Sequence, residues 1–252
     1  MSISFDDVPY EGRVIHTGRP EALAVEAWLR GVRVRHPARA RILELGCAEG
    51  ANTGAIAYHL SDAEVVGVDA SRRHIELATA MKDELGLDNL RYFHAGIEAL
   101  PDEVGGDFDY ILCHGVLSWV PEDVREAIFA TLAERLTPRG VGYVSYNVAP
   151  GWAMRGLVRQ VLRAHTRHLE GPQAKLDEAR ALLSLMSQTP FTAHHYGAYM
   201  AAEAADTLQH REPYIAHEYL AEENHPFTYG EIVRLAERHG LTFVTVAQLV
   251  AY

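Results

Sequence analysis

The chain has 252 residues, of which 48% are hydrophobic and 23% charged, a composition typical of a water-soluble protein with one sizeable core. Disordered and fibrous chains are excluded. The 23 Lys and Arg against 34 Asp and Glu give a net charge of -11, which disfavours nucleic acid as a partner. The two cysteines, Cys47 and Cys113, are too few for a disulfide framework, so we expect buried reduced thiols.

The N-terminus has neither a basic nor an apolar leader segment, and no apolar stretch reaches the roughly 18 residues of a membrane helix. We therefore predict a cytoplasmic protein that neither enters the secretory route nor binds a membrane. Residues 1–40 form an N-terminal arm and one helix, expected at residues 21–31.

From Arg41 onward, short β-branched runs alternate with longer helical patterns. This alternation predicts an α/β fold with a doubly wound, mostly parallel sheet. The expected helices include one that ends at Gly86, one that begins after Pro121 and one at residues 229–240. The strands are expected at residues 41–46, 65–68, 90–94, 108–113, 142–146 and 241–246.

The chain changes character after the fifth strand. Residues 41–150 form the predicted α/β core, whereas residues 151–222 have a helical pattern too long for an ordinary crossover. We interpret 151–222 as a helical cap inserted over the carboxyl ends of the strands, and 223–252 as a last helix and strand that return to the core. Within the cap, arginines recur every four residues and predict an exposed basic face, at Arg155, Arg159, Arg163 and Arg167.

The most informative stretch is Glu44-Leu-Gly-Cys-Ala-Glu-Gly-Ala-Asn52, between the first strand and a helix. Small residues let the backbone approach a ligand, and the helix that follows presents free N–H groups to it. Asp69 ends the second strand, 19 residues after Gly50, where a carboxylate can accept both hydroxyls of a ribose. These features fit S-adenosylmethionine or a dinucleotide.

Two details favour S-adenosylmethionine. A dinucleotide fingerprint has a third glycine, where this chain has Ala51. Glu44, two residues before Gly46, would repel a pyrophosphate and attract a methionine ammonium group. A nicotinamide-dependent oxidoreductase is therefore the less favoured alternative.

These residues resemble the class I S-adenosylmethionine-dependent methyltransferases, which share a Rossmann-like fold. Residues 44–50 resemble the first motif of that class, with Ala48 at a position that is usually glycine, and residues 66–71 and 108–120 resemble the second and fourth. Further segments resemble a bacterial subgroup that usually carries a C-terminal methyltransferase regulatory domain: Val-Pro-Tyr10, residues 114–121, 143–147, 150–152 and 217–227. We expect that domain to be missing, because the chain ends at Tyr252. The chain is then either a natural short form or part of a longer chain.

The resemblance also implies roles for individual residues. Glu44 and Gly46 would hold the amino-acid end of the cofactor, and Asp69 the ribose. The class usually has an Asp at the slot of Gly96, so Ile97 and Glu98 are expected on the adenine side. The full expected cofactor set is Tyr10, Glu44, Gly46, Ala48, Gly50, Asn52, Asp69, Ala70, Ile97, Glu98, His114, Gly115 and Trp119.

Methyl transfer requires alignment of acceptor and methyl group and removal of any acceptor proton. The candidate catalytic residues are His114, Tyr146 and Asn147; His114 is a base, a hydrogen-bonding partner of the cofactor or an edge histidine. No metal site is expected, because His217 lacks the second histidine of a zinc-binding helix.

The acceptor is an N or O nucleophile of a small molecule, peptide or protein, and the resemblance includes bacterial enzymes that methylate protein lysines. A non-catalytic module that binds S-adenosylmethionine is the main alternative function. The sequence does not determine the oligomeric state.

Overall fold

The computed structural model describes residues 12–188 and 195–247. The chain divides into two units, which we call the sheet unit (residues 12–146 and 227–247) and the helical unit (147–188 and 195–226). Across the described residues, no helix is both long enough and apolar enough to cross a membrane.

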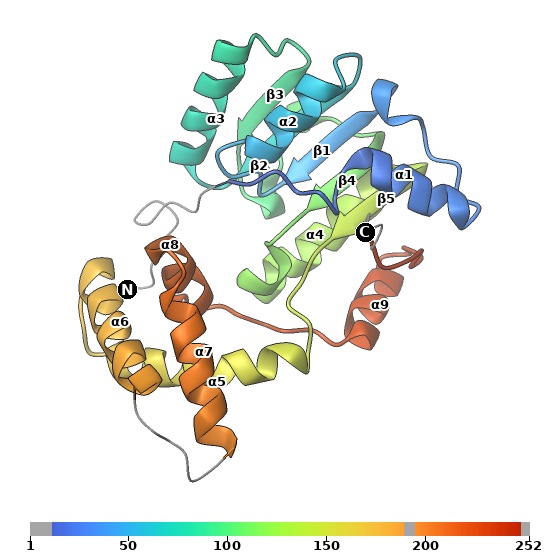
Figure 1. The fold of residues 1–252 in the computed structure, drawn as a ribbon. Helices are drawn as coiled ribbons and strands as arrows, with labels where there is room; N and C mark the ends of the chain where they lie inside the picture. The colour runs from blue at the N-terminus through green and yellow to red at the C-terminus, as the bar shows by residue number, and fades with distance from the viewer. Residues whose placement is uncertain (1–11, 189–194, 248–252) are drawn as a thin grey trace. The chain divides into compact units, whose positions relative to one another are not determined.

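The sheet unit contains five parallel strands in the order β3-β2-β1-β4-β5 (Figure 1). This arrangement confirms the predicted parallel α/β sheet. The strand order reverses direction between β1 and β4, and open α/β sheets bind their ligands at the carboxyl ends of strands at such a point. The strands are β1 Arg41–Leu45, β2 Glu64–Asp69, β3 Leu90–His94, β4 Phe108–Cys113 and β5 Leu136–Val144.

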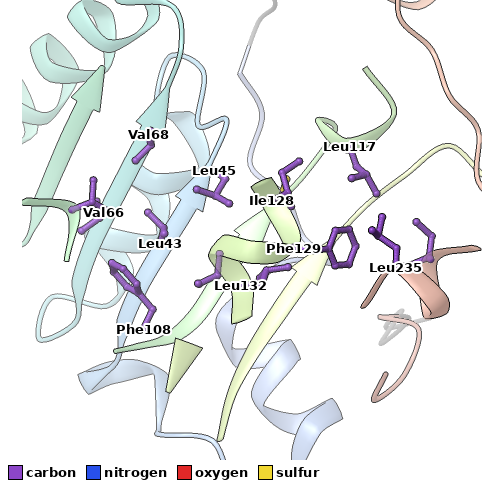
Figure 2. Packing of buried hydrophobic residues seen from close by; sticks show 14 of the residues in the cluster. Leu43, Leu45, Val66, Val68, Phe108, Leu117, Ile128, Phe129, Leu132 and Leu235 are labelled. Atoms are coloured by element: carbon purple, nitrogen blue, oxygen red, sulfur yellow. The ribbon is translucent and has the colours of Figure 1, made fainter. Parts of the chain in front are cut away.

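Helices cover both faces of the sheet, because side chains alternate between its two sides. On one face, Ile42 and Val65 join a core with residues of α1 (Pro20–Leu29) and α2 (Ala51–His59), and α3 (Arg72–Leu85) packs on β3 beside α2. The other face packs against α4 (Glu122–Arg135) and α9 (Tyr229–Arg238). Figure 2 shows this second core, with Leu43, Leu45, Val66 and Val68 of the sheet and Ile128, Phe129, Leu132 and Leu235 of the helices.

Local signals set the ends of the predicted helices. Ser71 caps the start of α3 by accepting a hydrogen bond from His74 N–H, and Gly86 ends that helix with a positive φ of 64°. Thr228 and Glu231 form a reciprocal capping box at the start of α9. Short 3-10 turns connect the elements: η1 Pro37–Arg39, η2 Ile97–Ala99, η3 Asp102–Val104 and η4 Leu117–Trp119.

The helical unit has its own apolar core, which includes Leu162, Leu176 and Leu183. As predicted from the pattern, its described elements are all helical. They are α5 Gly151–Thr166, α6 Pro172–Gln188, α7 His195–Leu208, α8 Glu212–Ile215 and a π-helical turn, η5, at Ala216–Leu220.

The last predicted strand and part of the predicted basic face are absent from the described fold. Residues 241–247 form no strand in the described part of the chain, although 241–246 alternates like one. Alternation positions side chains, but a strand also needs a backbone partner, and β5 pairs only with β4 among the described strands. The predicted exposed basic face is also incorrect at Arg159, which is 5% exposed.

Candidate functional site

The loop after β1 turns sharply at the carboxyl edge of the sheet. Gly46, Ala48 and Gly50 all have positive φ, at 72°, 46° and 81°. The N–H groups of Gly46 and Cys47 donate to the carbonyl of Val68 on β2, at 2.8 and 3.0 Å. The loop is therefore tied to the neighbouring strand, and its glycines allow turns that most residues resist.

Asp69, at the end of β2, fixes the same loop through its side chain. One carboxylate oxygen accepts the N–H of Ala48 at 2.9 Å, and the other accepts the N–H of Ser71 at 2.9 Å. Asp69 is not the N-cap of α3, because Ser71 holds that position. His74 Nδ1 also lies 3.3 Å from the oxygen that accepts Ser71 N–H. A carboxylate has about four acceptor sites, so Asp69 keeps capacity for one ligand hydroxyl.

Tyr92 of β3 contacts the glycine loop, a role that the sequence did not predict. Its hydroxyl donates to the carbonyl of Gly50 at 3.3 Å and lies 2.7 Å from the hydroxyl of Thr53. A Cβ at position 50 would collide with the Tyr92 hydroxyl. The glycine is thus required both for its φ and for the approach of Tyr92. A tyrosine in a half-buried strand looks like a core residue, so the sequence pattern alone did not reveal this role.

Glu44 is a buried acid beside the loop, with 4% of its surface exposed. One of its oxygens accepts a hydrogen bond from the Asn52 amide at 2.9 Å, while the other, Oε2, has no hydrogen-bond partner among the described residues. Burial raises the pKa of Glu44 to about 8. The hydrogen bond from Asn52 opposes this rise, and the negative charge of Asp69 adds to it.

Asn52, at the start of α2, also receives a hydrogen bond. Its side-chain oxygen accepts the N–H of Ile15 at 2.9 Å, so the segment before α1 lies against the glycine loop. The backbone of the arm is therefore connected to Glu44 through one buried amide. Tyr10, expected to close over the cofactor, lies outside the described residues.

His114 follows β4 at the same edge of the sheet. Its Nδ1 lies 3.1 Å from the hydroxyl of Tyr143 on β5, and that hydroxyl lies 3.0 Å from Thr17 Oγ1. Burial lowers the pKa of His114 and raises the pKa of Tyr143, which the bond to Thr17 opposes. Both rings are therefore neutral near pH 7.

The loop after β4 also contacts the glycine loop. Gly115 N–H donates to Ser145 Oγ at 2.7 Å, which joins the ends of β4 and β5. A Cβ at Gly46 would collide with the Val116 side chain, so the loops after β1 and β4 pack closely only because position 46 is glycine. The expected residues of these two loops are thus brought together.

The remaining predicted residues lie around this edge or beyond it. Ala70 is exposed, and its carbonyl lies 3.1 Å from His94 Nε2. Ile97 and Glu98 lie in the turn after β3, and the exposed Glu98 carboxylate folds back over Gly96, where a Cβ would meet it. Trp119 is half-buried at the end of η4.

Tyr146 and Asn147 fall beyond β5, which ends at Val144 and not at 146 as expected. The ring of Tyr146 packs edge-on against Phe227 in the sheet unit, with 6.2 Å between centroids. Asn147 belongs to the helical unit, where its amide donates to Asn224 Oδ1 at 3.4 Å. The structure therefore assigns these two neighbours in sequence to different units.

These features fit S-adenosylmethionine. The unpartnered oxygen of Glu44 matches a cationic N–H donor, such as an amino-acid ammonium group. The glycine loop turns at the carboxyl edge of the sheet, where open α/β sheets bind their ligands, and Asp69 there offers an acceptor to a hydroxyl group. Among the described residues, no group of three or more His, Cys, Asp or Glu is placed to hold a metal ion.

Comparison with protein families and relatives places this site in context. Residues 42–140 match a family described as a methyltransferase domain, and residues 211–252 match a predicted methyltransferase regulatory domain. The regulatory domain was expected to be missing, and that expectation is wrong. Its match begins at Arg211, within the segment interpreted as cap, and so extends over α8, η5 and α9.

Two proteins of Rickettsia prowazekii (strain Madrid E) are similar over nearly the whole chain. RP789 is 34% identical over 95% of this chain and 43% of its own length. RP028 is 31% identical over 94% of both chains.

PKMT2 from Rickettsia typhi, solved in complex with AdoHcy, is 29% identical and superposes with a TM-score of 0.85. The match covers 95% of this chain and 46% of PKMT2, so this chain spans about half the length of that protein. With the two matched domains, these similarities decide between the cofactor classes that the glycine loop left open: the chain belongs to the class I S-adenosylmethionine-dependent methyltransferases that carry a methyltransferase regulatory domain.

Proposed function

We propose that this protein transfers a methyl group from S-adenosylmethionine to a nitrogen or oxygen nucleophile of an acceptor. The observation that carries the proposal is the buried Glu44, whose Oε2 lacks a partner among the described residues beside a loop shaped by glycines. A buried acid with an unpaired oxygen is costly unless a ligand completes it. An ammonium group completes the ionised carboxylate, whereas a dinucleotide pyrophosphate would be repelled by it.

Within this proposal, the sheet unit holds the cofactor by three contacts. Glu44 accepts a hydrogen bond from the methionine ammonium. Asp69 accepts from a ribose hydroxyl with the capacity left beside the N–H groups of Ala48 and Ser71 and His74 Nδ1. Glu98, folded back over position 96, takes the place of the Asp that the family usually has on the adenine side. The other proposed cofactor residues are Tyr10, Gly46, Ala48, Gly50, Asn52, Ala70, Ile97, His114, Gly115 and Trp119.

The cofactor supplies an electrophilic methyl group on a sulfonium, so the protein needs little covalent chemistry of its own. Its residues must orient the acceptor, exclude water and provide hydrogen bonds to the acceptor atom. We assign these roles to His114, at the end of β4, and to Tyr146 and Asn147, which follow β5.

We also propose an acceptor class and a cellular compartment. A lysine side chain of a protein is the first acceptor to test, because the motifs resemble those of enzymes that methylate protein lysines. The net charge of -11 argues against nucleic acid and anionic membrane surfaces as partners. Cys47 and Cys113 are free and buried, which supports a reducing, cytoplasmic setting.

A calorimetric titration with S-adenosylmethionine and S-adenosylhomocysteine tests the cofactor proposal. We expect micromolar binding, weakened by about 10- to 100-fold in Asp69→Asn, since a hydrogen bond to a charged group contributes about 1.5–3 kcal/mol. Asp62→Asn is the matched control. Asp62 lines a shallow cavity of about 330 Å³ with Asp88 and Arg91, beside the first residue of β2 and hence at the opposite end of the strands. No binding by the folded wild-type protein would contradict the proposal.

Methyl transfer is then measured as S-adenosylhomocysteine released in the presence of lysine-containing proteins and of small amines and alcohols. Product formed with one acceptor class and lost in Asp69→Asn supports the enzyme. Tight cofactor binding without product from any acceptor would favour the non-catalytic binding module.

A further inference from the structure

His114 directly follows the last residue of β4, and the side chains of Tyr143 and Thr17 determine its environment. The Tyr143 hydroxyl lies 3.1 Å from its Nδ1, and the two rings are parallel within 3° at 5.9 Å between centroids. The second ring nitrogen, Nε2, has no hydrogen-bond partner among the described residues. The protonation of one nitrogen therefore determines what the other can offer to a ligand.

Tyr143 is itself held in place. Its hydroxyl lies 3.0 Å from the exposed Thr17 Oγ1, and its ring packs so closely on Gly18 that a Cβ there would approach Tyr143 Cε1 to 3.0 Å. Thr17, Tyr143 and His114 thus form a chain of hydrogen bonds that begins at the segment before α1. Each hydroxyl can donate only one proton. If Tyr143 donates to His114, Thr17 must therefore donate to Tyr143, and if His114 donates to Tyr143, the Tyr143 proton is free to go to Thr17.

Acidity favours one direction. A phenol O–H is a much stronger acid than the N–H of a neutral imidazole, and an imidazole nitrogen is a stronger base than a phenol oxygen. The better arrangement therefore has the Tyr143 O–H donating to Nδ1. Thr17, exposed to water, then donates its proton to the Tyr143 oxygen and accepts hydrogen bonds from solvent. The reverse direction would pair the weaker donor with the weaker acceptor.

We propose that Tyr143 is a positioning residue that holds His114 as its Nε2–H tautomer, so that His114 donates a hydrogen bond to the cofactor or acceptor and does not take the acceptor proton. This inference rests on the proposed function and deepens it, because the sequence left base and hydrogen-bonding partner as open roles for His114. It also implies that the acceptor proton leaves to water or to another group.

The tautomer is measured directly by nitrogen NMR of protein labelled at histidine, with His114→Gln used to assign its signals. We expect wild-type His114 to be neutral with the proton on Nε2, and Tyr143→Phe to shift the population toward the Nδ1–H form. Tyr58→Phe, on an exposed tyrosine of α2, is the matched control. A wild-type signal with the proton on Nδ1 would overturn the proposal, whether or not the protein transfers methyl groups.

Kinetics provide a second readout. The amide N–H of a glutamine can replace an Nε2–H donor but cannot act as a base. We therefore expect His114→Gln to recover most of the kcat/KM lost in His114→Ala, a loss of about 10-fold for one hydrogen bond. Equal losses in the two variants, with a wild-type rate that rises with pH through the His114 pKa, would identify a base and contradict the proposal.

Cofactor affinity, measured on the same proteins, separates failure of the proposed function from failure of the role proposed for Tyr143. If wild-type protein fails to bind S-adenosylmethionine, the proposed function fails, while the tautomer remains measurable. If it binds and turns over but Tyr143→Phe leaves the tautomer of His114 unchanged, only the role of Tyr143 fails.

Discussion

Both units bury ionisable side chains, and Glu44 of the sheet unit and Arg159 of the helical unit are satisfied in different ways. In the sheet unit Glu44 is 4% exposed, and in the helical unit Arg159 is 5% exposed. The Arg159 guanidinium donates to the carbonyls of Ala221, Glu222 and Glu223, at 2.6–3.1 Å. Glu44 has one bond from Asn52 and one oxygen without a partner among the described residues.

The difference separates a structural charge from a binding charge. Arg159 holds the chain that follows η5, and its donors are used within the helical unit. Glu44 is left incomplete at the ligand-binding edge of the sheet, where an incoming cation can complete it. Burial of an ionisable side chain therefore does not by itself indicate a binding site. The indication at Glu44 is its oxygen without a hydrogen-bond partner among the described residues.

The largest effect expected from this comparison is on the stability of the helical unit. Arg159→Met keeps an apolar stem but leaves three carbonyls without their donor, and should lower its free energy of unfolding by about 3 kcal/mol. Hydrogen exchange at the amides of residues 216–220 measures the loss. Arg163→Met, on the exposed side of α5, should cost less than about 0.5 kcal/mol. Similar losses in both variants would show that the bonds of Arg159 do not stabilise the unit.

Glu44→Gln should weaken cofactor binding. Without the negative charge, affinity for S-adenosylmethionine should fall by about 10- to 100-fold, equal to roughly 1.5–3 kcal/mol. Calorimetry measures this change, and Glu76→Gln, on α3, serves as a control in the same unit. An unchanged dissociation constant would show that Glu44 does not contact the cofactor.

The pH dependence of stability follows from the raised pKa of Glu44. Its folded pKa is about 8 and its ordinary value 4.5, so between these values the folded protein holds a proton that the unfolded chain releases. This stabilisation is complete below the ordinary value and is lost as the pH rises through the folded pKa. Relative to Glu44→Gln, wild-type stability should fall by up to about 1.4 kcal/mol per pH unit in this window. Urea unfolding of both proteins across the window measures it, and parallel curves would contradict the raised pKa.

The smallest expected effect is at Tyr92, which supports the glycine loop. Tyr92→Phe removes the hydrogen bond to the Gly50 carbonyl and should weaken cofactor binding by about 1 kcal/mol, roughly fivefold. Tyr110→Phe, on β4, is a control, because its hydroxyl binds the carbonyl of Arg35 away from the loop. Equal effects of the two variants on binding would remove Tyr92 from the site.

The sequence predicted the five parallel strands and the cluster at their carboxyl ends because these depend on local patterns. Apolar periodicity located the strands, and the glycine spacing with Asp69 located the loop. Tyr92 and Tyr143 were not predicted as site residues, because a tyrosine in a strand has the same pattern whether its hydroxyl is buried in the core or contacts the site.

Other errors share one physical cause: the sequence pattern shows a face but not its partner. Arg159 lies in a helical row of arginines, and only the carbonyls after η5 make its burial favourable. The alternation at 241–246 likewise suggests a strand, but no described strand pairs with it. Contacts distant in sequence decided both cases.

The central claim is that the cofactor's positive charge completes Glu44, and proton counting tests it most directly. With a pKa of about 8, Glu44 is mostly protonated near neutral pH and must lose its proton to hold a cation. Calorimetry of S-adenosylmethionine binding, in buffers of different ionisation enthalpy, should therefore show release of about one more proton by wild-type protein than by Glu44→Gln near neutral pH. Equal proton release by the two proteins, with equal affinities, would contradict the account.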